Sequence, residues 1–279
     1  MNFVTNVTRI ALVAIAVACG SAVEARAATW EPVAHGVANG VESVFSMTLD
    51  PTGGLIAAGG YEDVCGTFAC GAPITVNHIA RWSGSAWSGF GDGMDAGVHT
   101  ATFAHDGRLY AGGFFSTAGG HPASAIAVWN GTDWAALGTG IVKGGGAYVN
   151  AIAVDAAGNV YAAGDFDTAG GVPANNIAMW NGSTWSPLGS GVDQPVYTLA
   201  IGPDGAVYVG GDFATAGGVP ANNIAMWNGS TWSSLGDGFN DTVTAIAFDR
   251  TDRLLAAGYF SASGGGAPMV GLARWNGTF

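Results

Sequence analysis

The stretch GGDFATAGGVPANNIAMWNGSTWSSLGDG, Gly210–Gly238, decides the fold, because most of its letters recur at a fixed distance along the chain. Its central part, NNIAMWNGSTW, occurs at Asn175–Trp185 and again, unchanged, at Asn222–Trp232. A tryptophan of this unit recurs at steps of 47, 51, 47 and 48 residues, at Trp82, Trp129, Trp180, Trp227 and Trp275. The longest step contains the extra residues Lys143–Gly146. A period in this range is the signature of a repeat architecture.

Each unit predicts four short antiparallel strands. In the fourth unit these are Val196–Gly202, Ala206–Phe213, Ile224–Trp227 and Thr231–Gly236. A longer loop separates the second strand from the third, and the pair Asn228-Gly229 favours a tight type I′ turn between the third and the fourth. Four antiparallel strands repeated in this way predict an all-β chain, a β-propeller in which each unit is one blade.

The number of units predicts five blades. Fourth-strand sequences occur five times, and the first of them, Thr29–Val37, precedes any complete unit. Sequences of strands one to three also occur five times, and the last ends near Trp275. We expect the segment 29–37 to complete the last blade, so that residues 28–279 form one domain in which no sheet edge is left unpaired. The alternative is that the chain is a fragment of a longer repeat array.

The first residues predict export. Arg9 precedes the apolar run Ile10–Ala18, and the pattern Ala25-Arg26-Ala27 is typical of a signal-peptide cleavage site. Residues 1–27 are therefore interpreted as a signal peptide cleaved after Ala27, with lipoprotein processing at Cys19 as the alternative. No later segment is predicted to span a membrane, and the expected location is secreted, periplasmic or at the cell surface.

The composition narrows the partners. Only 10% of the residues are charged and the net charge is −12, so the clustered lysines and arginines that nucleic-acid phosphates require are absent from the sequence. In an exported protein the close pair Cys65 and Cys70 predicts a local disulfide rather than a metal site. The chain is expected to be a monomer.

Candidate binding residues fall on one predicted face of the propeller. Because strand direction alternates, the loop between strands two and three shares a face with the connection to the next blade. Carboxylate and amide oxygens there suit Ca²⁺ and also hydrogen-bond to sugar hydroxyls, although such residues commonly satisfy local backbone groups instead. The candidates are Asp165, Asp212, Asn175, Asn176, Asn222, Asn223, Asp193 and Asp241.

The copies differ at these positions, which argues against five equivalent sites. Phe114 and Tyr259 stand where two blades have Asp165 and Asp212. One asymmetric pocket, or two matching blades, fits this variation better. The repeated tryptophans are interpreted as packing between blades rather than as sugar-stacking surfaces, because they recur at one strand register.

The unit, written G-G-x-F-x-x-A-G-G-x(5)-I-A-x-W-N-G-x-x-W-x-x-L-G-x-G, resembles the kelch-like repeats of exported bacterial proteins that share a module with the fungal cortical polarity-marker family. The resemblance covers residues 29–279 and implies a β-propeller at the cell surface or outside the cell. It implies no reaction. The five-fold count and the period are also similar to those of tachylectin-type sugar-binding propellers.

Three functional hypotheses follow from the sequence. The first is an exported, non-enzymatic propeller that binds a glycan, a cation or a protein through the face with the longer loops. The second is a hydrolase or lyase acting on polysaccharide, with Asp165, Asp212 and Asp241 as the acids. The third is a purely structural surface module.

Overall fold

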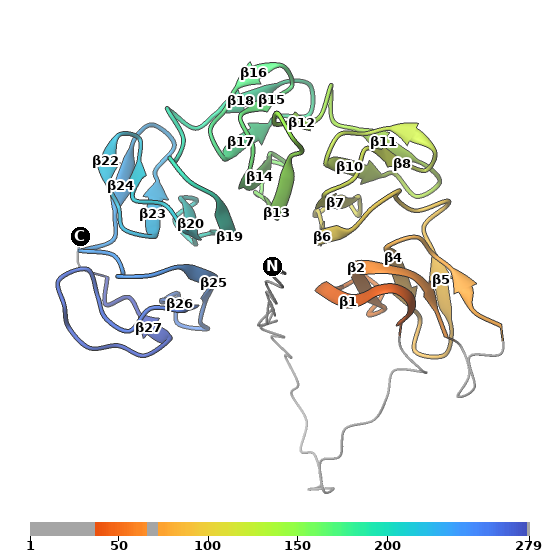
Figure 1. Cartoon of the computed structure of the whole chain (residues 1–279), viewed down its shortest axis with the longest axis horizontal. Coiled ribbons are helices and arrows are strands. Elements are labelled where there is room, and N and C mark those ends of the chain that lie inside the picture. The colour runs from red at the N-terminus through yellow and green to blue at the C-terminus, as the bar shows by residue number, and fades with distance from the viewer. Residues whose placement is uncertain (1–36, 66–71, 278–279) are drawn as a thin grey trace, which may run out of the picture.

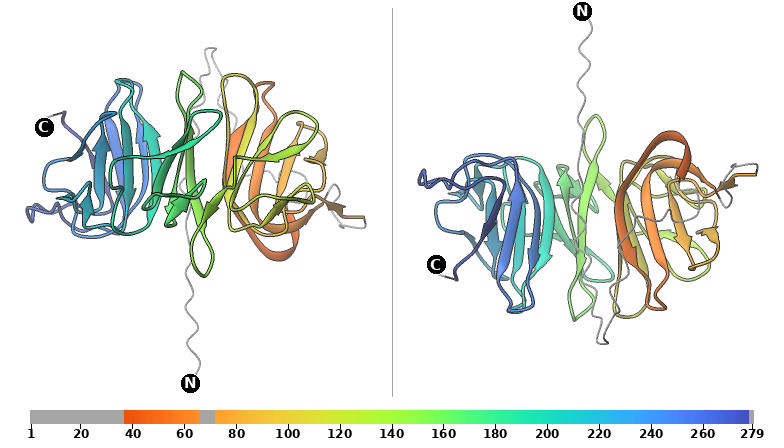
Figure 2. Two further views of the ribbon diagram at one scale, coloured as in Figure 1. Left: turned by 90° about the horizontal axis from the view of Figure 1, so that it is seen from above. Right: turned by 90° about the horizontal axis from the view of Figure 1, so that it is seen from below.

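The computed structural model describes residues 37–65 and 72–277, and within them it contains strands and turns but no helix. The described part therefore holds no helix that could cross a membrane. Five larger sheets follow one another along an arc, each with its first strand nearest the centre (Figure 1). Seen from the edge, their strands run between the two faces of the arc (Figure 2). The all-β prediction is confirmed.

Each sheet corresponds to one repeat unit, called here a blade. The predicted boundaries of the fourth unit agree with its strands to within two residues. From the inner to the outer strand, the blades are blade 1, β1 (Val37–Leu49), β2 (Leu55–Val64), β4 (Ile79–Trp82) and β5 (Trp87–Gly89); blade 2, β6 (Val98–Phe103), β7 (Leu109–Gly113), β10 (Ile126–Trp129) and β11 (Trp134–Ala136); blade 3, β13 (Tyr148–Val154), β14 (Val160–Asp165), β17 (Ile177–Trp180) and β18 (Trp185–Pro187); blade 4, β19 (Val196–Ile201), β20 (Val207–Gly211), β23 (Ile224–Trp227) and β24 (Trp232–Ser234); and blade 5, β25 (Val243–Phe248), β26 (Leu254–Gly258) and β27 (Leu272–Arg274).

The predicted long loop between strands two and three contains a small hairpin that sequence reasoning missed. The hairpins are β8 (Thr117–Ala118) with β9 (His121–Pro122), β15 (Thr168–Ala169) with β16 (Val172–Pro173), and β21 (Thr215–Ala216) with β22 (Val219–Pro220). In blade 1, β3 (Ile74–Thr75) pairs with β2 instead. The Gly-Gly pair at each hairpin turn has positive φ at both positions, for example 62° at Gly217 and 82° at Gly218, which is the conformation that such tight turns require.

The turn between strands three and four differs from the predicted type I′ turn. Trp180 pairs directly with Trp185, so four residues form the connection. The Asn181 side-chain oxygen accepts hydrogen bonds from the backbone N–H groups of Ser183 and Thr184, both at 2.9 Å. Only Gly182 in this turn has a positive φ, of 95°. Asparagine serves here by bonding its own turn, not by adopting the left-handed conformation.

The hairpins join neighbouring blades. The residue that follows strand four of one blade pairs with the hairpin of the next blade, as in Met94 with Ala118 and Val192 with Ala216. Between blades 2 and 3 the same pairing is extended into the strand β12 (Ile141–Val142), which pairs with β15. The hairpins and the inter-blade connections therefore share one face, as predicted, and we call it the hairpin face.

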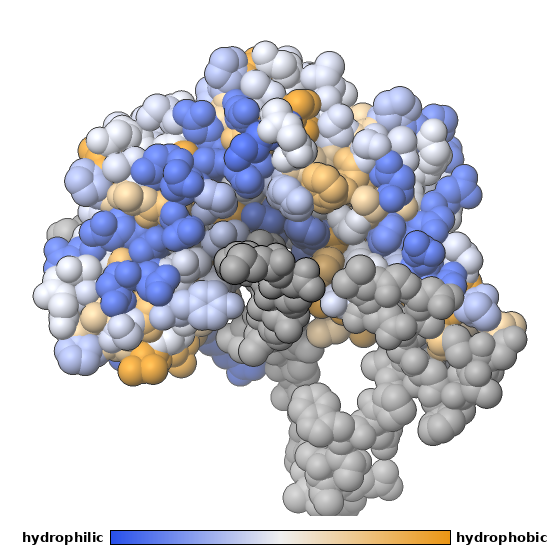
Figure 3. Space-filling model, viewed as in Figure 1, coloured by the Kyte–Doolittle hydropathy of each residue, from blue (hydrophilic) through white to orange (hydrophobic). Residues whose placement is uncertain are grey.

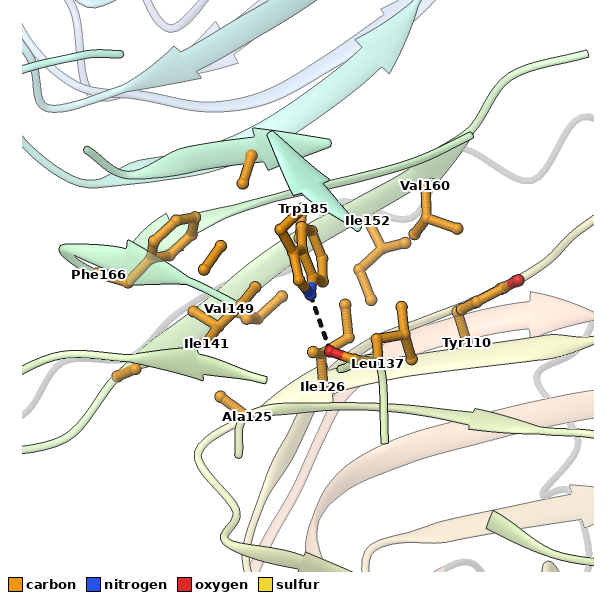
Figure 4. Close-up of a cluster of buried hydrophobic side chains, with 14 of the residues drawn as sticks. Tyr110, Ala125, Ile126, Leu137, Ile141, Val149, Ile152, Val160, Phe166 and Trp185 are labelled. Atoms are coloured by element: carbon orange, nitrogen blue, oxygen red, sulfur yellow. Dashed lines mark hydrogen bonds between the residues drawn. The ribbon is translucent and has the colours of Figure 1, made fainter. Parts of the chain in front are cut away.

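The core lies between the blades. Figure 4 shows the cluster between blades 2 and 3, in which Ile126 and Leu137 face Val149 and Trp185. The indole N–H of Trp185 donates to the Leu137 carbonyl at 2.8 Å. Equivalent bonds join Trp134 to Phe90 and Trp232 to Leu188 across the neighbouring junctions. The interpretation of the tryptophans as packing residues with a bonded N–H is confirmed.

The motif L-G-x-G after strand four is required by these contacts. A Cβ on Gly189 would lie 3.1 Å from the Trp227 ring of the next blade. A Cβ on Gly191 would lie 2.2 Å from the Asn175 carbonyl oxygen, and φ at this position is 72°. Glycine is the residue that tolerates both the close approach and the positive φ.

The described strands form an open arc, with β1 and β25 at its two ends (Figure 1). Residues 29–36 of the predicted closing strand lie outside the described residues, and Val37 is the first residue of β1. Both ends expose apolar side chains that are buried elsewhere. Leu272 is 64% exposed, whereas its equivalents Ile126 and Ile177 are 0% exposed, and Val44 is 38% exposed, whereas Val98 is 0% exposed.

The inter-blade hydrogen bond predicts a specific cost for Trp185→Phe. Removing the indole donor leaves the buried Leu137 carbonyl without its partner, which should lower the free energy of unfolding by about 2 kcal/mol. Denaturant unfolding measures the change. Trp180→Phe is the matched control, because the Trp180 indole makes no hydrogen bond within the described residues, and it should cost less. Equal costs for the two variants would contradict the assignment.

Candidate functional site

The connection between blades 2 and 3 differs from its equivalents. At three other junctions a side-chain oxygen after strand four accepts hydrogen bonds from two backbone N–H groups of the next blade. Asp95 accepts from Ser116 and Thr117, Asp193 from Ala214 and Thr215, and Asn240 from Ser261 and Ala262, at 2.8–3.0 Å. Between blades 2 and 3 the equivalent residue is Val142, which has no such oxygen and is 47% exposed.

These bonds identify Asp193, one of the predicted site residues, as a group that holds two blades together. Its counterpart Asp95 shows the electrostatic consequence. Burial alone would raise the pKa of Asp95, but hydrogen bonds from the Ser116 hydroxyl and from the backbone N–H groups of Thr117 and Ser116 lower it below the usual value. The charged form of this aspartate is therefore stabilised by the fold.

A cavity of about 400 Å³ opens on the hairpin face at the junction of blades 2 and 3. Its walls are mainly apolar and include Phe114, Val142 and Ala147, while Ser116, Ser124 and Lys143 supply polar groups. Figure 3 shows mostly hydrophilic residues on the visible surface, with hydrophobic residues gathered around β7 and β13 on the inner side of the arc. The volume and the apolar lining are typical of ligand-binding pockets.

The extra residues Lys143–Gly146 form one side of this cavity. The ammonium group of Lys143 makes an ion pair and a hydrogen bond with the carboxylate of Asp165, at the end of β14. Both side chains are about one-third exposed, so solvent reaches the pair. Sequence reasoning selected Asp165 but treated Lys143 only as part of an insertion.

A row of aromatic rings crosses the inner strands beside the cavity. Phe45 on β1 contacts His99 on β6 edge to face at 5.2 Å, His99 stacks on Tyr148 of β13 at 5.7 Å, and Tyr148 stacks on Phe114 at 4.5 Å. Phe114 remains 42% exposed. These residues were not predicted from sequence; the available signal was that Phe114 and Tyr148 depart from the repeat at neighbouring positions.

Each inner strand carries a β-bulge at the same position. The register skips one residue in every inner strand, and the skipped residues are Phe45, His99, Asn150, Tyr197 and Thr244. Bulges re-aim a side chain and are common next to functional sites. Two of these residues meet, because His99 Nδ1 and Asn150 Oδ1 lie 3.3 Å apart.

The asparagines predicted as ligand groups in blade 3 are bonded within the chain. Asn176 accepts from the Phe166 N–H at 3.1 Å and donates to the Val192 carbonyl at 2.9 Å, and it is 8% exposed. Asn175 donates to the Ser190 carbonyl at 2.9 Å. Asn176 has a φ of 64°, a conformation that asparagine tolerates better than most residues. Its repetition is therefore explained by the fold.

The pair in blade 4 has the same role. Asn222 donates to the Asp237 carbonyl at 2.9 Å and Asn223 to the Phe239 carbonyl at 3.0 Å. Both have positive φ, of 46° and 72°. The amide nitrogens in blades 3 and 4 thus connect the entry to strand three with the segment that follows strand four.

The remaining predicted carboxylates lie at different junctions. Asp212 and Asp241 approach the same residue, since the Thr242 hydroxyl donates to Asp212 at 3.4 Å and the Thr242 N–H donates to Asp241 at 2.7 Å. Asp165 is held by Lys143 one blade away. The structure therefore brings Asp212 and Asp241 together and separates Asp165 from them.

The predicted disulfide and cation are only partly visible. Cys65 is disulfide-bonded, and its predicted partner Cys70 lies outside the described residues. Within residues 37–65 and 72–277, no group of three or more histidine, cysteine, aspartate or glutamate side chains is arranged to hold a metal ion.

Comparison with known proteins identifies a β-propeller-like fold. A family model described as "Domain of unknown function (DUF5122) beta-propeller" matches residues 202–225. No curated protein matches the chain. Among solved structures, the chain is similar to the extracellular domains of two hybrid two component systems from B. thetaiotaomicron, with TM-scores of 0.54 and 0.51 at 8% and 14% identity over 84% of this chain.

A further similar structure is the WD40 beta propeller domain of Doa1, with a TM-score of 0.50 and 12% identity over 84% of this chain and 63% of that one. The chain spans only about a quarter of the two bacterial extracellular structures, 27% and 26% of their lengths. At these identities the likeness shows the fold alone.

The structural role of Asp193 predicts different effects of two substitutions. Asp193→Ala removes the acceptor of two backbone N–H groups and should lower the free energy of unfolding by about 1 kcal/mol, because the site is exposed. Asp193→Asn should be nearly neutral, since Asn240 makes the same two bonds in the next junction. Thermal or denaturant unfolding distinguishes the two. A large loss with asparagine would contradict this role.

Proposed function

We propose that the protein is an exported, non-enzymatic binding module that takes a glycan or a protein on its hairpin face. The observation that carries the proposal is the cavity at the junction of blades 2 and 3, where apolar walls and the Lys143–Asp165 pair occur together. Asp165, Asp212 and Asp241 stay in the proposal as surface acceptors. A Ca²⁺ ion bound by such oxygens is a subsidiary proposal.

Export is part of this proposal. It rests on the sequence of residues 1–27, with cleavage after Ala27 or lipoprotein processing at Cys19, and on the similarity to extracellular bacterial domains. The resemblance to kelch-like repeats and to the fungal polarity-marker module is compatible with the same location. A monomeric state is proposed with it.

We also propose that the ring has five blades and closes through residues 29–37. Val37 pairs with Val64 of blade 1. In the repeat this is the pairing of Met94 with Ala118, between the end of one blade and the next blade. Val37 thus takes the position that follows strand four of a blade preceding blade 1. Blade 5, whose described residues form three strands, is the blade that lacks such a strand.

Two buried or exposed groups support the same closure. The Trp87 indole N–H is buried and has no acceptor within the described residues. Its equivalents donate to residues three positions after the tryptophan of the preceding strand four, and after Trp30 that residue is Val33. Closure would also cover Leu272 and Val44, whose equivalents are buried in the other junctions.

Closure predicts that Trp87→Phe is as costly as Trp185→Phe. If the Val33 carbonyl accepts from Trp87, the substitution should lower the free energy of unfolding by about 2 kcal/mol. If the indole has no acceptor, removing its N–H should be neutral or stabilising. Deleting residues 28–40 is the second measurement, and it should cause aggregation or loss of cooperative melting. A neutral Trp87→Phe, or an unchanged monomeric transition after the deletion, would contradict closure.

The binding role is tested with a screen of the purified chain against a glycan array, a panel of polysaccharides and Ca²⁺, together with assays for chain cleavage. We expect retention of a ligand without cleavage. Release of new chain ends would favour the hydrolase or lyase alternative with Asp165, Asp212 and Asp241. Absence of any ligand would favour the purely structural alternative.

The face is tested by placing a bulky group on either side. Gly144 lies exposed in the connection beside the cavity, and Ser183 lies exposed in a turn between strands three and four, on the opposite face. Gly144→Cys coupled to a polyethylene glycol maleimide should block binding, whereas Ser183→Cys coupled in the same way should not. The opposite pattern would place the ligand on the other face.

A further inference from the structure

Three departures from the repeat meet at the cavity between blades 2 and 3. Phe114 stands where blades 3 and 4 have Asp165 and Asp212, Val142 stands where other junctions have a bonded oxygen, and the connection is longer by the residues Lys143–Gly146. The other junctions show what folding requires at these positions. An exposed phenylalanine and an exposed valine add nothing to that requirement, and exposed apolar groups at one place commonly mark a binding site.

The aromatic wall of the cavity is held in one position. The Phe114 ring stacks on Tyr148 at 4.5 Å with an angle of 15° between the ring planes. On another side it lies against the backbone of Gly146, where φ is 114° and a Cβ would come within 2.5 Å of the ring. The inserted glycine thus permits a contact that any other residue would obstruct. A ring held this way offers a preformed surface, which reduces the entropy lost on binding.

The polar group beside this wall is a donor next to an acceptor. The Lys143 ammonium group carries three donors, and the Asp165 carboxylate accepts more bonds than the one from Lys143. Neighbouring hydroxyls of a sugar ring can bond to both. The carboxylate of Asp95, which also lines the cavity, is occupied by Ser116 and Thr117.

Charge selects among sugars. One ammonium and two carboxylates, those of Asp165 and Asp95, lie at the cavity, and the whole chain has a net charge of −12. A phosphate, a sulfate or a uronic acid would meet a negative potential there, whereas a neutral sugar would not. The size of the cavity suits a small ligand rather than an extended protein surface.

We propose that the cavity binds a neutral sugar residue of a glycan, with an apolar face of the ring against Phe114 and Val142 and with hydroxyls bonded to Lys143 and Asp165. This assignment rests on the binding function proposed above. It identifies the ligand class and places the ligand at one junction, not on all five blades.

The test uses calorimetric titration of the purified chain with neutral oligosaccharides of glucose, galactose and mannose, and with the corresponding oligouronides. A neutral oligosaccharide should bind and the oligouronides should not. Phe114→Asp and Lys143→Met should each weaken binding by about tenfold or more, the loss expected for one charged hydrogen bond or one packed ring. Phe114→Asp should fold normally, because blades 3 and 4 carry aspartate at this position.

Tyr259→Asp is the matched control, since Tyr259 occupies the equivalent position in blade 5, away from the cavity, and it should leave binding unchanged. Lys143 is the only lysine in the sequence, so acylation of its amine gives a second measurement, and a neutral oligosaccharide should protect it.

Different failures have different meanings. Retained binding in both Phe114→Asp and Lys143→Met, or undiminished acylation of Lys143 in the presence of the sugar, would overturn the location. Preference for oligouronides, or binding of a protein or Ca²⁺ but no neutral sugar, would overturn the ligand class and leave the binding function intact. A chain that binds nothing in either screen would overturn both proposals.

Discussion

The structure depends on one hydrogen bond that crosses between blades. The indole N–H of the strand-four tryptophan donates to a carbonyl of the preceding blade, as in Trp185 with Leu137. A buried N–H must find a partner, and a bond of fixed length between two sheets sets how closely they approach. The second tryptophan of each unit covers the glycine that follows strand four in the preceding blade, as Trp227 covers Gly189. Repetition of these two contacts makes each blade fit its neighbours.

The same contacts account for most of the polar residues on the hairpin face. Asp95, Asp193 and Asn240 bind the next hairpin, and Asn176 and Asn223 bind the segment that follows strand four. Inter-blade connections leave backbone groups without strand partners, and short polar side chains satisfy them. A polar residue that recurs in a repeat protein is therefore first explained by the junction, and a residue that breaks the recurrence by something outside the fold.

The sequence predicted the strands closely and the site poorly, for physical reasons. Strand positions follow from alternating apolar residues and from the tryptophan period, which are local signals. The hairpins were missed because two-residue strands carry almost no pattern, although the Gly-Gly pair marked their turn. The bulges at His99 and Asn150 depend on pairing with the neighbouring strand, and the Phe114–Tyr148 contact joins two blades. Neither is encoded in one unit. Asp165 was selected correctly as a residue of the hairpin face, but the meaning of Lys143 emerged only from their contact.

The two kinds of candidate site depend differently on how the ring is completed. The cavity is formed by blade 2 and by the connections that precede and follow it, and its polar pair is completed by Asp165 of blade 3, all within the described residues. Its geometry is therefore set by one junction and is the same in an open arc and in a closed ring. The bulge residues behave differently, because Phe45 belongs to blade 1 and Thr244 to blade 5, at opposite ends of the arc. These two can act on one ligand only if the ends meet. A ligand that needs the junction alone would bind to a chain with disturbed closure, whereas a ligand that needs the axis would not, so the response of binding to closure reports which of the two surfaces the protein uses.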